Sequence, residues 1–241
     1  MREILYYFER DLKRWTRSRK SVFSSLAMPA AWLVFVGLAL PIRFTDNYLD
    51  FITPGILVMT MLFASLQGGT LLIFDKILGF LNKFLALPAP RESILFGKIL
   101  FIAFRGLLQS TVILAMAILL GVKMHSFMTV PLTYLVLFIF GVLFSAIATT
   151  VALLVDDYDS YSAMNSMASM PLFFTSSALM PYEMMPQWLR VIASLNPVSY
   201  AIDTVRALFS GNFLLDGMVE LTAMVVVVLM VSVYVFRKAT V

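Results

Sequence analysis

Cysteine is absent from the 241-residue sequence, and His125 is its only histidine. Without cysteine the chain forms no disulfide, no thiolate metal site and no cysteine nucleophile. A single histidine also excludes any catalytic or metal site that needs two imidazoles from one chain. We therefore predict no metal site, and we assign no special role to His125, which falls in a short predicted loop.

Charged residues are also scarce. They make up 13% of the sequence, about half the share typical of soluble domains, whereas 61% of the residues are hydrophobic. The 18 basic and 14 acidic residues are too few to cover the surface of a soluble protein of this size. They cluster in short segments separated by long uncharged runs. This pattern is typical of a chain embedded in lipid.

Six apolar runs predict an all-α polytopic membrane protein, with residues 1–241 forming one transmembrane domain. Each run can cross a hydrocarbon core of about 30 Å, and the only charge inside them is Arg105. The sixth run is short, but Met218, Val219 and a snorkelling Glu220 lengthen it. A further stretch, Val191–Ile202, is too short to cross and suits a re-entrant or interfacial segment. The predicted spans are Ser21–Leu40, Phe51–Phe74, Ile99–Gly121, Pro131–Val155, Tyr161–Met180 and Leu221–Phe236.

The distribution of lysine and arginine predicts the orientation. With six spans the two termini share a side, and that side carries thirteen of these residues. The opposite side carries four, namely Arg43, Lys123, Arg190 and Arg206. The positive-inside rule therefore places both termini in the cytoplasm. The net charge of +4 follows from this topology and does not call for a nucleic-acid partner. A cleaved signal peptide is not expected, because the first apolar run is too long for one.

Residues 1–20 are predicted to form an amphipathic helix in the membrane interface. Its apolar residues fall within an arc of about 100° on a helical wheel, and basic residues occupy the opposite face. Such a helix either anchors the topology or offers a docking surface to a partner, and one helix can do both. The apolar arc contains Ile4, Leu5, Phe8, Leu12 and Trp15, and the basic face contains Arg10, Lys13, Arg14 and Arg17.

A second helix is predicted in the cytoplasmic loop of residues 75–98. Pro88 and Pro90 would end it. A helix with an apolar face in such a loop buries that face against lipid, against its own bundle or against another protein. The apolar residues at helical spacing are Ile77, Leu78, Leu81, Phe84 and Leu85.

The external segment 181–216 is predicted to consist of broken helices. Trp188 fits the boundary between lipid and water, and Asn196 followed by proline favours the start of a new helix. Asp203 and Arg206 are three residues apart, a spacing that lets them pair. The segment is then a plug, a gate or an extracellular cap. The prolines that divide it are Pro181, Pro186 and Pro197.

Polar residues inside the second and fifth spans are candidates for a substrate path, with ordinary helix packing as the alternative. Met164, Met167 and Met170 recur there and would supply a flexible wall. Arg105 would snorkel, because it lies about six residues into the third span. The acidic turn 156–159 is either solvated or in contact with a basic partner. The candidate path contains Thr60, Gln67, Asn165, Ser169, Met170 and Phe173.

Neither paired acids, a histidine cluster nor a Ser–Lys or Asp–Asp arrangement appears on adjacent spans, which argues against an intramembrane enzyme. A membrane channel or scaffold needs no such residues, so that class stays open.

The order of these parts resembles the ABC-2 family of ABC exporter permeases, in particular its drug and polysaccharide branch, which includes daunorubicin-resistance permeases. Three stretches carry the resemblance: the loop 74–98, with Leu85-Ala86-Leu87-Pro88-Ala89-Pro90-Arg91-Glu92; Ser176–Leu189; and Asn196-Pro197-Val198-Ser199-Tyr200-Ala201-Ile202-Asp203 followed by Arg206. The chain departs from the family pattern at Asp75-Lys76, where an acid–Arg–acid run is expected.

The resemblance implies a permease that exports a hydrophobic or amphipathic substrate, such as a drug, lipid or glycan, from a prokaryotic cell across its plasma membrane. The sequence contains no Gly-x-x-x-x-Gly-Lys-Ser/Thr pattern, so ATP and Mg²⁺ would bind two copies of a separate ATPase subunit. A second copy of this chain would complete a two-fold pathway. The implied ATPase-coupling residues are Asp75, Lys76, Gly79, Phe80, Leu81, Lys83, Phe84, Leu87, Pro88 and Arg91. The implied external gate contains Pro181, Pro186, Trp188, Asn196, Pro197, Asp203 and Arg206.

Overall fold

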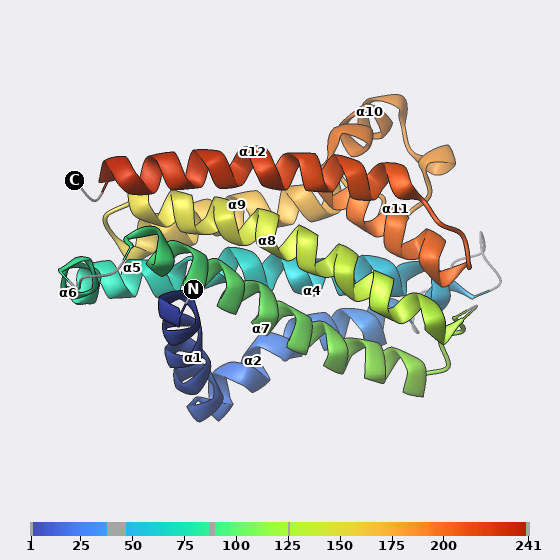
Figure 1. Cartoon of the computed structure of the whole chain (residues 1–241). Helices are drawn as coiled ribbons and strands as arrows, with labels where there is room; N and C mark the ends of the chain where they lie inside the picture. The colour runs from blue at the N-terminus through green and yellow to red at the C-terminus, as the bar shows by residue number, and fades with distance from the viewer. Residues whose placement is uncertain (1, 38–46, 87–89, 125, 240–241) are drawn as a thin grey trace.

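The computed structural model describes residues 2–37, 47–86, 90–124 and 126–239, and those residues form helices and no strand. The long helices are α2, which continues into the π-helical segment η1, and then α4, α7, α8, α9 and α12 (Figure 1). The bounds are α1 Arg2–Arg17, α2 Arg19–Ala31, η1 Trp32–Val36, α4 Tyr48–Gly68, α5 Thr70–Ile77, α6 Phe80–Leu85, α7 Glu92–Leu119, η2 Phe127–Thr129, α8 Val130–Leu154, α9 Tyr158–Phe174, η3 Tyr182–Met184, α10 Gln187–Leu195, α11 Pro197–Phe209 and α12 Leu215–Ala239.

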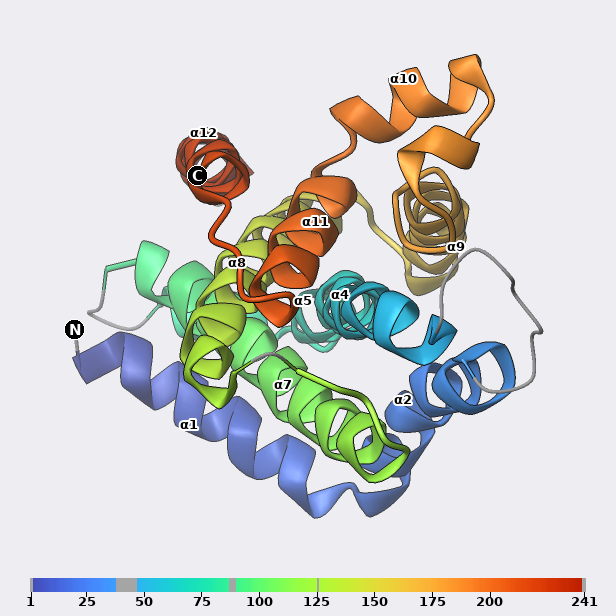
Figure 2. The same cartoon turned by 90° about the vertical axis from the view of Figure 1, so that its right-hand side faces the viewer.

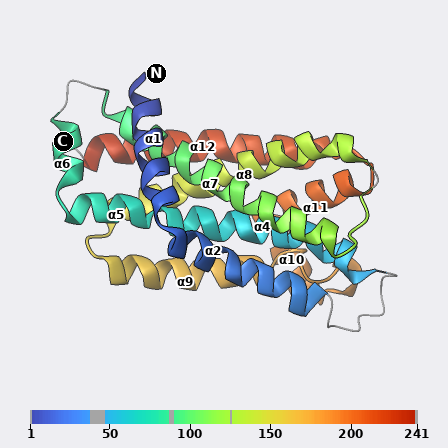
Figure 3. The ribbon, with the colours of Figure 1, turned by 90° about the horizontal axis from the view of Figure 1, so that it is seen from below.

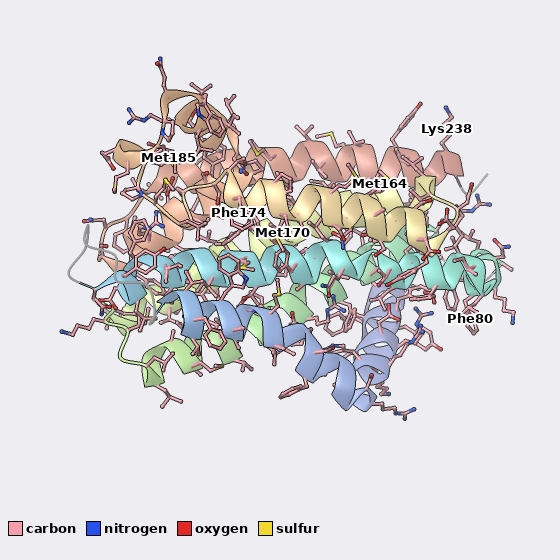
Figure 4. The ribbon with its side chains drawn as sticks, turned by 180° about the vertical axis from the view of Figure 1, so that it is seen from behind. Phe80, Met164, Met170, Phe174, Met185 and Lys238 are labelled. Carbon is pink, nitrogen blue, oxygen red and sulfur yellow. The ribbon has the colours of Figure 1, made fainter. Side chains whose placement is uncertain are left out.

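The long helices run side by side along one axis, and α1 crosses them nearly at right angles (Figures 1 and 3). The C-terminal end of α12 and α6 lie at one end of the bundle, called here the α6 end. Helix α10 lies at the other end, called the α10 end. Phe80 and Lys238 share the α6 end, and Met185 lies at the α10 end (Figure 4).

Four stretches are long and apolar enough to cross a membrane: Tyr48–Ile77, Glu92–Leu119, Val130–Leu154 and Leu215–Lys238. They correspond to the second, third, fourth and sixth predicted spans. The first predicted span contains a shorter apolar helix, Val22–Val36, and its residues 38–40 lie outside the described residues. The fifth corresponds to α9, which has 17 residues and is rich in serine. Six spans therefore remain a prediction.

Helix α4 is the centre of the bundle, and α12 lies at its edge (Figure 2). In the apolar 18-residue part of Tyr48–Ile77, 78% of the residues are buried, against 17% in the corresponding part of Leu215–Lys238 in α12. Helix α4 packs against α7 and α8, whereas α12 packs mainly against α8. Most of the apolar surface of α12 is thus left for lipid or another chain.

The loop between the second and third spans differs from the prediction. One helix was expected through the apolar series, but Gly79 adopts a left-handed conformation with φ of 71° and separates α5 from α6. Helix α6 ends at Leu85, before either proline, and Pro88 lies outside the described residues. Apolar spacing alone did not reveal the break, because glycine tolerates this conformation without a change in pattern.

Two long helices begin earlier than their predicted spans. Helix α7 begins at Glu92, seven residues before the predicted third span, and α12 begins at Leu215, as the predicted lengthening of the sixth span required. The predicted helix of residues 1–20 ends at Arg17, and α2 starts at Arg19 after a break at Ser18.

Replacing Gly69 with alanine should destabilise the bundle. The backbone of Gly69 joins α4 to α5, and an added Cβ would clash with the Tyr161 hydroxyl and lie 2.7 Å from the carbonyl oxygen of Ala148. We expect Gly69→Ala to lower the free energy of unfolding by about 1–3 kcal/mol in detergent, measured by loss of helical circular dichroism. Ser166→Ala, on the exposed face of α9, is the control and should change it by less than about 0.5 kcal/mol. Equal effects of the two substitutions would contradict this close packing.

Candidate functional site

A buried ion cluster joins α1, α5 and α7 near the α6 end. The side chains of Asp11, Asp75 and Lys98 are each only 1% exposed. The Lys98 Nζ atom lies 2.5 Å from Asp75 Oδ2 and 3.6 Å from Asp11 Oδ2. Arg10 donates to Asp75 at 2.8 Å and to Asp11 at 2.6 Å. Each carboxylate is therefore paired with a cation from another helix or from the same helix, and we call these four residues the Asp75 cluster.

The surroundings of the Asp75 cluster keep α1 in place. Burial disfavours the Arg10 cation, but the carboxylate of Asp11 and the hydrogen bond to Asp75 outweigh this effect and raise the pKa of Arg10. The same guanidinium lies over the ring of Phe84, 4.5 Å from its centroid, and Tyr7 packs edge-on against that ring. The amphipathic helix is thus attached to α6 by both charge and aromatic contacts.

Lys76 makes a second contact inside the chain. Its Nζ atom donates to the carbonyl oxygens of Leu153 and Val155 at 3.2 and 3.0 Å, and to Asp156 at 2.7 Å. A cation at these last carbonyls is stabilised by the dipole of α8. The acidic turn 156–159 therefore contacts a basic residue of its own chain, and Asp75 and Lys76 both make internal contacts.

The remaining predicted coupling residues divide into a buried and an exposed set. Leu81 is buried and Phe84 packs on α1, whereas Phe80 is 41% exposed. Ile77 and Leu78 are 53% and 56% exposed and lie beside it in the chain. We call Ile77, Leu78 and Phe80 the apolar strip. The Lys83 ammonium lies 5.4 Å from the Phe80 ring centroid. Arg91 immediately precedes α7, and Leu87 and Pro88 lie outside the described residues.

A polar groove occupies the space between α1, α2, α4, α5, α7 and α9. It consists of two adjoining cavities of about 340 and 540 Å³. Figure 4 shows α2, α4 and α9 side by side on this face, with Met170 labelled on α9. Both cavities are lined by Trp15, Gln67, Arg105, Asn165 and Ser166.

The groove brings together four of the six predicted path residues, Gln67, Asn165, Ser169 and Met170. Thr60 is buried and donates to the carbonyl of Ile56 in its own helix, at 2.7 Å. Phe173 is also fully buried, and its ring packs edge-on against Trp32. These two residues therefore belong to the packed core.

The predicted methionine wall is wrong for two of its three members. Met170 lines the groove, but Met164 lines a separate apolar pocket with Leu66 and Tyr161. Met167 is 77% exposed on the outside of α9. The spacing of three residues drifts around a helix of 3.6 residues per turn, so the three sulfur atoms do not converge.

The prediction that Arg105 would snorkel is also wrong. Its Nη2 atom donates to the Ala64 carbonyl of α4 at 2.7 Å, and the residue is 9% exposed. Because α7 starts at Glu92 and ends at Leu119, Arg105 is at the middle of the helix. Gln109, one turn later, donates to Ser25 of α2 at 2.8 Å.

The external segment forms a second polar cluster at the α10 end. The predicted pairing of Asp203 with Arg206 is confirmed at 3.2 Å. Asp203 also accepts hydrogen bonds from Ser177 at 2.6 Å and Tyr182 at 2.8 Å. Arg206 lies over the Phe51 ring, 4.0 Å from the centroid. Burial and the neighbouring Asp203 raise the pKa of Tyr182 to about 12, so its phenol stays protonated and donates. This cluster ties α11 to the loop after α9 and to α4.

Asn196 starts α11 as predicted, and Pro197 occupies the first turn. The Asn196 side-chain oxygen accepts from the Val198 amide at 2.9 Å, while its amide donates to Leu172 of α9 at 2.7 Å. Pro181 and Pro186 immediately precede η3 and α10, and Trp188 is 64% exposed on α10.

Sequence reasoning missed several residues of the site. Asp11 lies about 20° from Ile4 on the helical wheel, beside the apolar arc, which indicates a charge facing the bundle. Lys98 and Arg105 both lie on α7, where a charge next to or inside an apolar run indicates a partner or a functional role. Gln109 and Ser25 gave no comparable signal. No group of three His, Asp or Glu residues in the described ranges could hold a metal ion, and His125 lies outside those ranges.

Breaking the Asp75 cluster should destabilise the chain far more than breaking an exposed ion pair on α1. Asp75→Asn leaves Lys98 and Arg10 without their shared carboxylate, and we expect a loss of about 3–5 kcal/mol in the free energy of unfolding. The matched control is Glu9→Gln, which breaks the 2.6 Å pair between the exposed Glu9 and Lys13 side chains. The control should lose less than about 0.5 kcal/mol. Denaturant titration in detergent measures both, and similar losses would rule out a structural role for the cluster.

Comparison with known proteins identifies the family. The ABC-2 type transporter family matches residues 2–210. The chain is 34% identical to the putative transport permease ycf38 of Cyanophora paradoxa, over 80% of this chain and 69% of that protein. It is 28% identical to the probable doxorubicin resistance ABC transporter permease protein DrrC of Mycobacterium tuberculosis, over 99% of this chain and 89% of that protein.

A third relative is the daunorubicin resistance ABC transporter permease protein DrrB1 of Streptomyces coeruleorubidus. It is 29% identical, over 70% of this chain and 60% of that protein. The family match covers most of the chain, including α1, the Asp75 cluster, the groove and the external cluster. This protein is therefore a multi-pass membrane protein that belongs to the ABC-2 type transporter family.

Proposed function

We propose that this chain is the permease subunit of an ABC exporter, driven by a separate ATPase subunit. It would move a hydrophobic or amphipathic substrate outward across the plasma membrane of a prokaryote. The observation that carries the proposal is the exposed apolar strip of an ABC-2 family chain whose sequence contains no P-loop. Exposed apolar side chains at the end of a bundle favour contact with another protein.

The Asp75 cluster connects the apolar strip to the helices that line the groove. Asp75 lies two residues before Ile77, and its ion pairs reach Arg10 on α1 and Lys98 on α7. Helices α1 and α7 both contribute groove residues, Trp15 and Arg105. A displacement of α6 by the ATPase would therefore act on two walls of the groove at once. This coupling is a hypothesis that rests on physical contact between the elements.

Two copies of the chain and two of the ATPase would form the working exporter, with ATP and Mg²⁺ bound to the ATPase. The large exposed apolar surface of α12 and the exposed residues of α9 are available for lipid or for a second copy. The external cluster would close the pathway at the α10 end. A channel or scaffold without ATP coupling is the alternative, and it predicts conduction or assembly without nucleotide.

Reconstitution with an ATPase subunit that copurifies with the chain tests the function. In proteoliposomes we expect ATP hydrolysis that rises when the transported substrate is added. Phe80→Ala should reduce this coupled hydrolysis several-fold, because it truncates the apolar strip. Phe213→Ala removes a ring that is 65% exposed, in the segment between α11 and α12, and is the matched control. Hydrolysis that ignores substrate, or an equal effect of both variants, would argue against the proposal.

The proposed topology can be measured directly because the chain contains no native cysteine. With six spans, Lys83→Cys and Lys238→Cys should react with a membrane-impermeant maleimide only after the cell membrane is opened. Lys123→Cys, in the turn after α7, should react in intact cells. Labelling of Lys83→Cys and Arg14→Cys on opposite faces of the membrane, the pattern expected for four spans, would overturn this topology.

A further inference from the structure

Arg105 is a buried cation without an acidic partner among the residues that the structure describes. The residue is 9% exposed and sits at the middle of α7. One hydrogen bond, to the Ala64 carbonyl, engages its Nη2 atom, and its buried Nε atom has no partner. Within the described part of the chain, none of the ion pairs involves it. A guanidinium presents five N–H donors, so most of its donors are left for something outside the fold.

Lys98 provides the comparison within the same helix. It lies seven residues earlier, is 1% exposed against 9% for Arg105, and is held between two carboxylates. The fold therefore compensates one of the two buried cations of α7 and leaves the other uncompensated. An unpaired buried charge is strongly unfavourable, and in apolar surroundings such a residue usually marks a ligand or ion site.

The groove around Arg105 is suited to an anion that carries an apolar body. In the smaller cavity Arg105 is the one charged residue among the lining side chains that the structure describes. The larger cavity adds Arg14 and Asp11, and Asp11 is already paired with Arg10 and Lys98. Apolar lining comes from Met28, Phe63 and Met170.

Polar groups near Arg105 can complete the binding of a headgroup. Asn165 lines both cavities, and its buried Oδ1 atom has no hydrogen-bond partner, so it can accept from a hydroxyl. Ser166 and Gln67 are exposed within the groove and can donate or accept. The planar guanidinium matches the oxygens of a phosphate or carboxylate.

We propose that Arg105 binds the oxyanion of an amphipathic ligand in this groove, and that the exported substrate class is an anionic amphiphile. The apolar body would lie against Met28 and Met170, while the phosphate or carboxylate meets Arg105. The assignment as substrate rests on the proposed exporter function, whereas the binding site itself does not.

Binding is tested on the full chain purified in detergent. The probes are dihexanoyl-phosphatidylglycerol, dihexanoyl-phosphatidylcholine and inorganic phosphate, and the readout is the concentration dependence of the thermal unfolding midpoint. We expect the anionic lipid to bind at least about tenfold more tightly than the zwitterionic lipid, the difference expected for a charge-assisted hydrogen bond. Inorganic phosphate should bind weakly, because it lacks the apolar body.

Two substitutions of Arg105 distinguish an effect of its charge on binding from an effect on folding. Arg105→Gln should abolish the preference for the anionic lipid, and Arg105→Lys should retain part of it. The matched control, Arg190→Gln, removes an exposed arginine of α10 and should leave the preference intact. Without lipid, the unfolding midpoint of Arg105→Gln should equal or exceed that of the parent chain, because the substitution removes an unpaired buried charge. Equal binding of the two lipids, or an unchanged preference in Arg105→Gln, would overturn the site.

Tryptophan fluorescence locates the bound lipid. In the Trp32→Phe/Trp188→Phe background, Trp15 in the groove is the one remaining tryptophan. Brominated phosphatidylglycerol should quench it more than brominated phosphatidylcholine, and Arg105→Gln should remove this difference. Equal quenching by both lipids would contradict binding of the anionic headgroup in the groove.

A transport measurement distinguishes an exported substrate from a resident lipid. In proteoliposomes with ATP, outward movement of fluorescent phosphatidylglycerol that is lost in Arg105→Gln supports the substrate class. Lipid that binds through Arg105 but does not move overturns that class and leaves a structural lipid site. If ATP hydrolysis is coupled but the anionic lipid is not preferred, this inference fails and the exporter function stands. If the lipid binds through Arg105 but no ATPase assembles, the site stands and the exporter function fails.

Discussion

The ion cluster of Asp75, Lys98, Arg10 and Asp11 is the contact on which the arrangement of the α6 end depends. None of α1, α5 and α7 could bury its charge alone, because the desolvation of an isolated ion is not repaid inside an apolar bundle. The charges are compensated only when the three helices meet. The three helices meet at this cluster. The crossing position of α1, the break at Gly79 and the start of α7 at Glu92 all allow this contact.

The opposite end of the bundle uses the same chemistry with different elements. Asp203 accepts hydrogen bonds from Arg206 of α11 and from Ser177 and Tyr182 in the segment after α9. Arg206 also donates to the carbonyl of Ser177. Where the helices of this segment are interrupted, side chains form hydrogen bonds with backbone groups. A chain in or near lipid requires such bonds, because water does not satisfy its backbone there. Between these two ends lies the groove. Its walls come from six helices, and its central cation has no counterion among the residues that the structure describes.

The contrast between Lys98 and Arg105 relates stability to function. The paired lysine holds α7 against α1 and α5, while the unpaired arginine faces the groove two turns further along the same helix. A rigid support beside an incompletely satisfied polar group is a common arrangement in binding sites. The exposed strip of Ile77, Leu78 and Phe80 lies next to the same support. The surface for a partner and the groove for a ligand are thus joined through one set of buried contacts.

Apolar run lengths and charge distribution determined, from the sequence alone, a helical membrane protein, four of its spans, the amphipathic helix α1 and the start of α11 at Asn196. These features are local, because they depend on periodicity and on residues a few positions apart. The Asp203–Arg206 pair could be predicted for the same reason. Only the tertiary structure decided that Asp75 faces Lys98 and Arg10, that Lys76 caps α8, and that Arg105 turns inward. Each of these contacts joins residues from 23 to 80 positions apart, and helix packing, which sequence spacing does not record, brings them together.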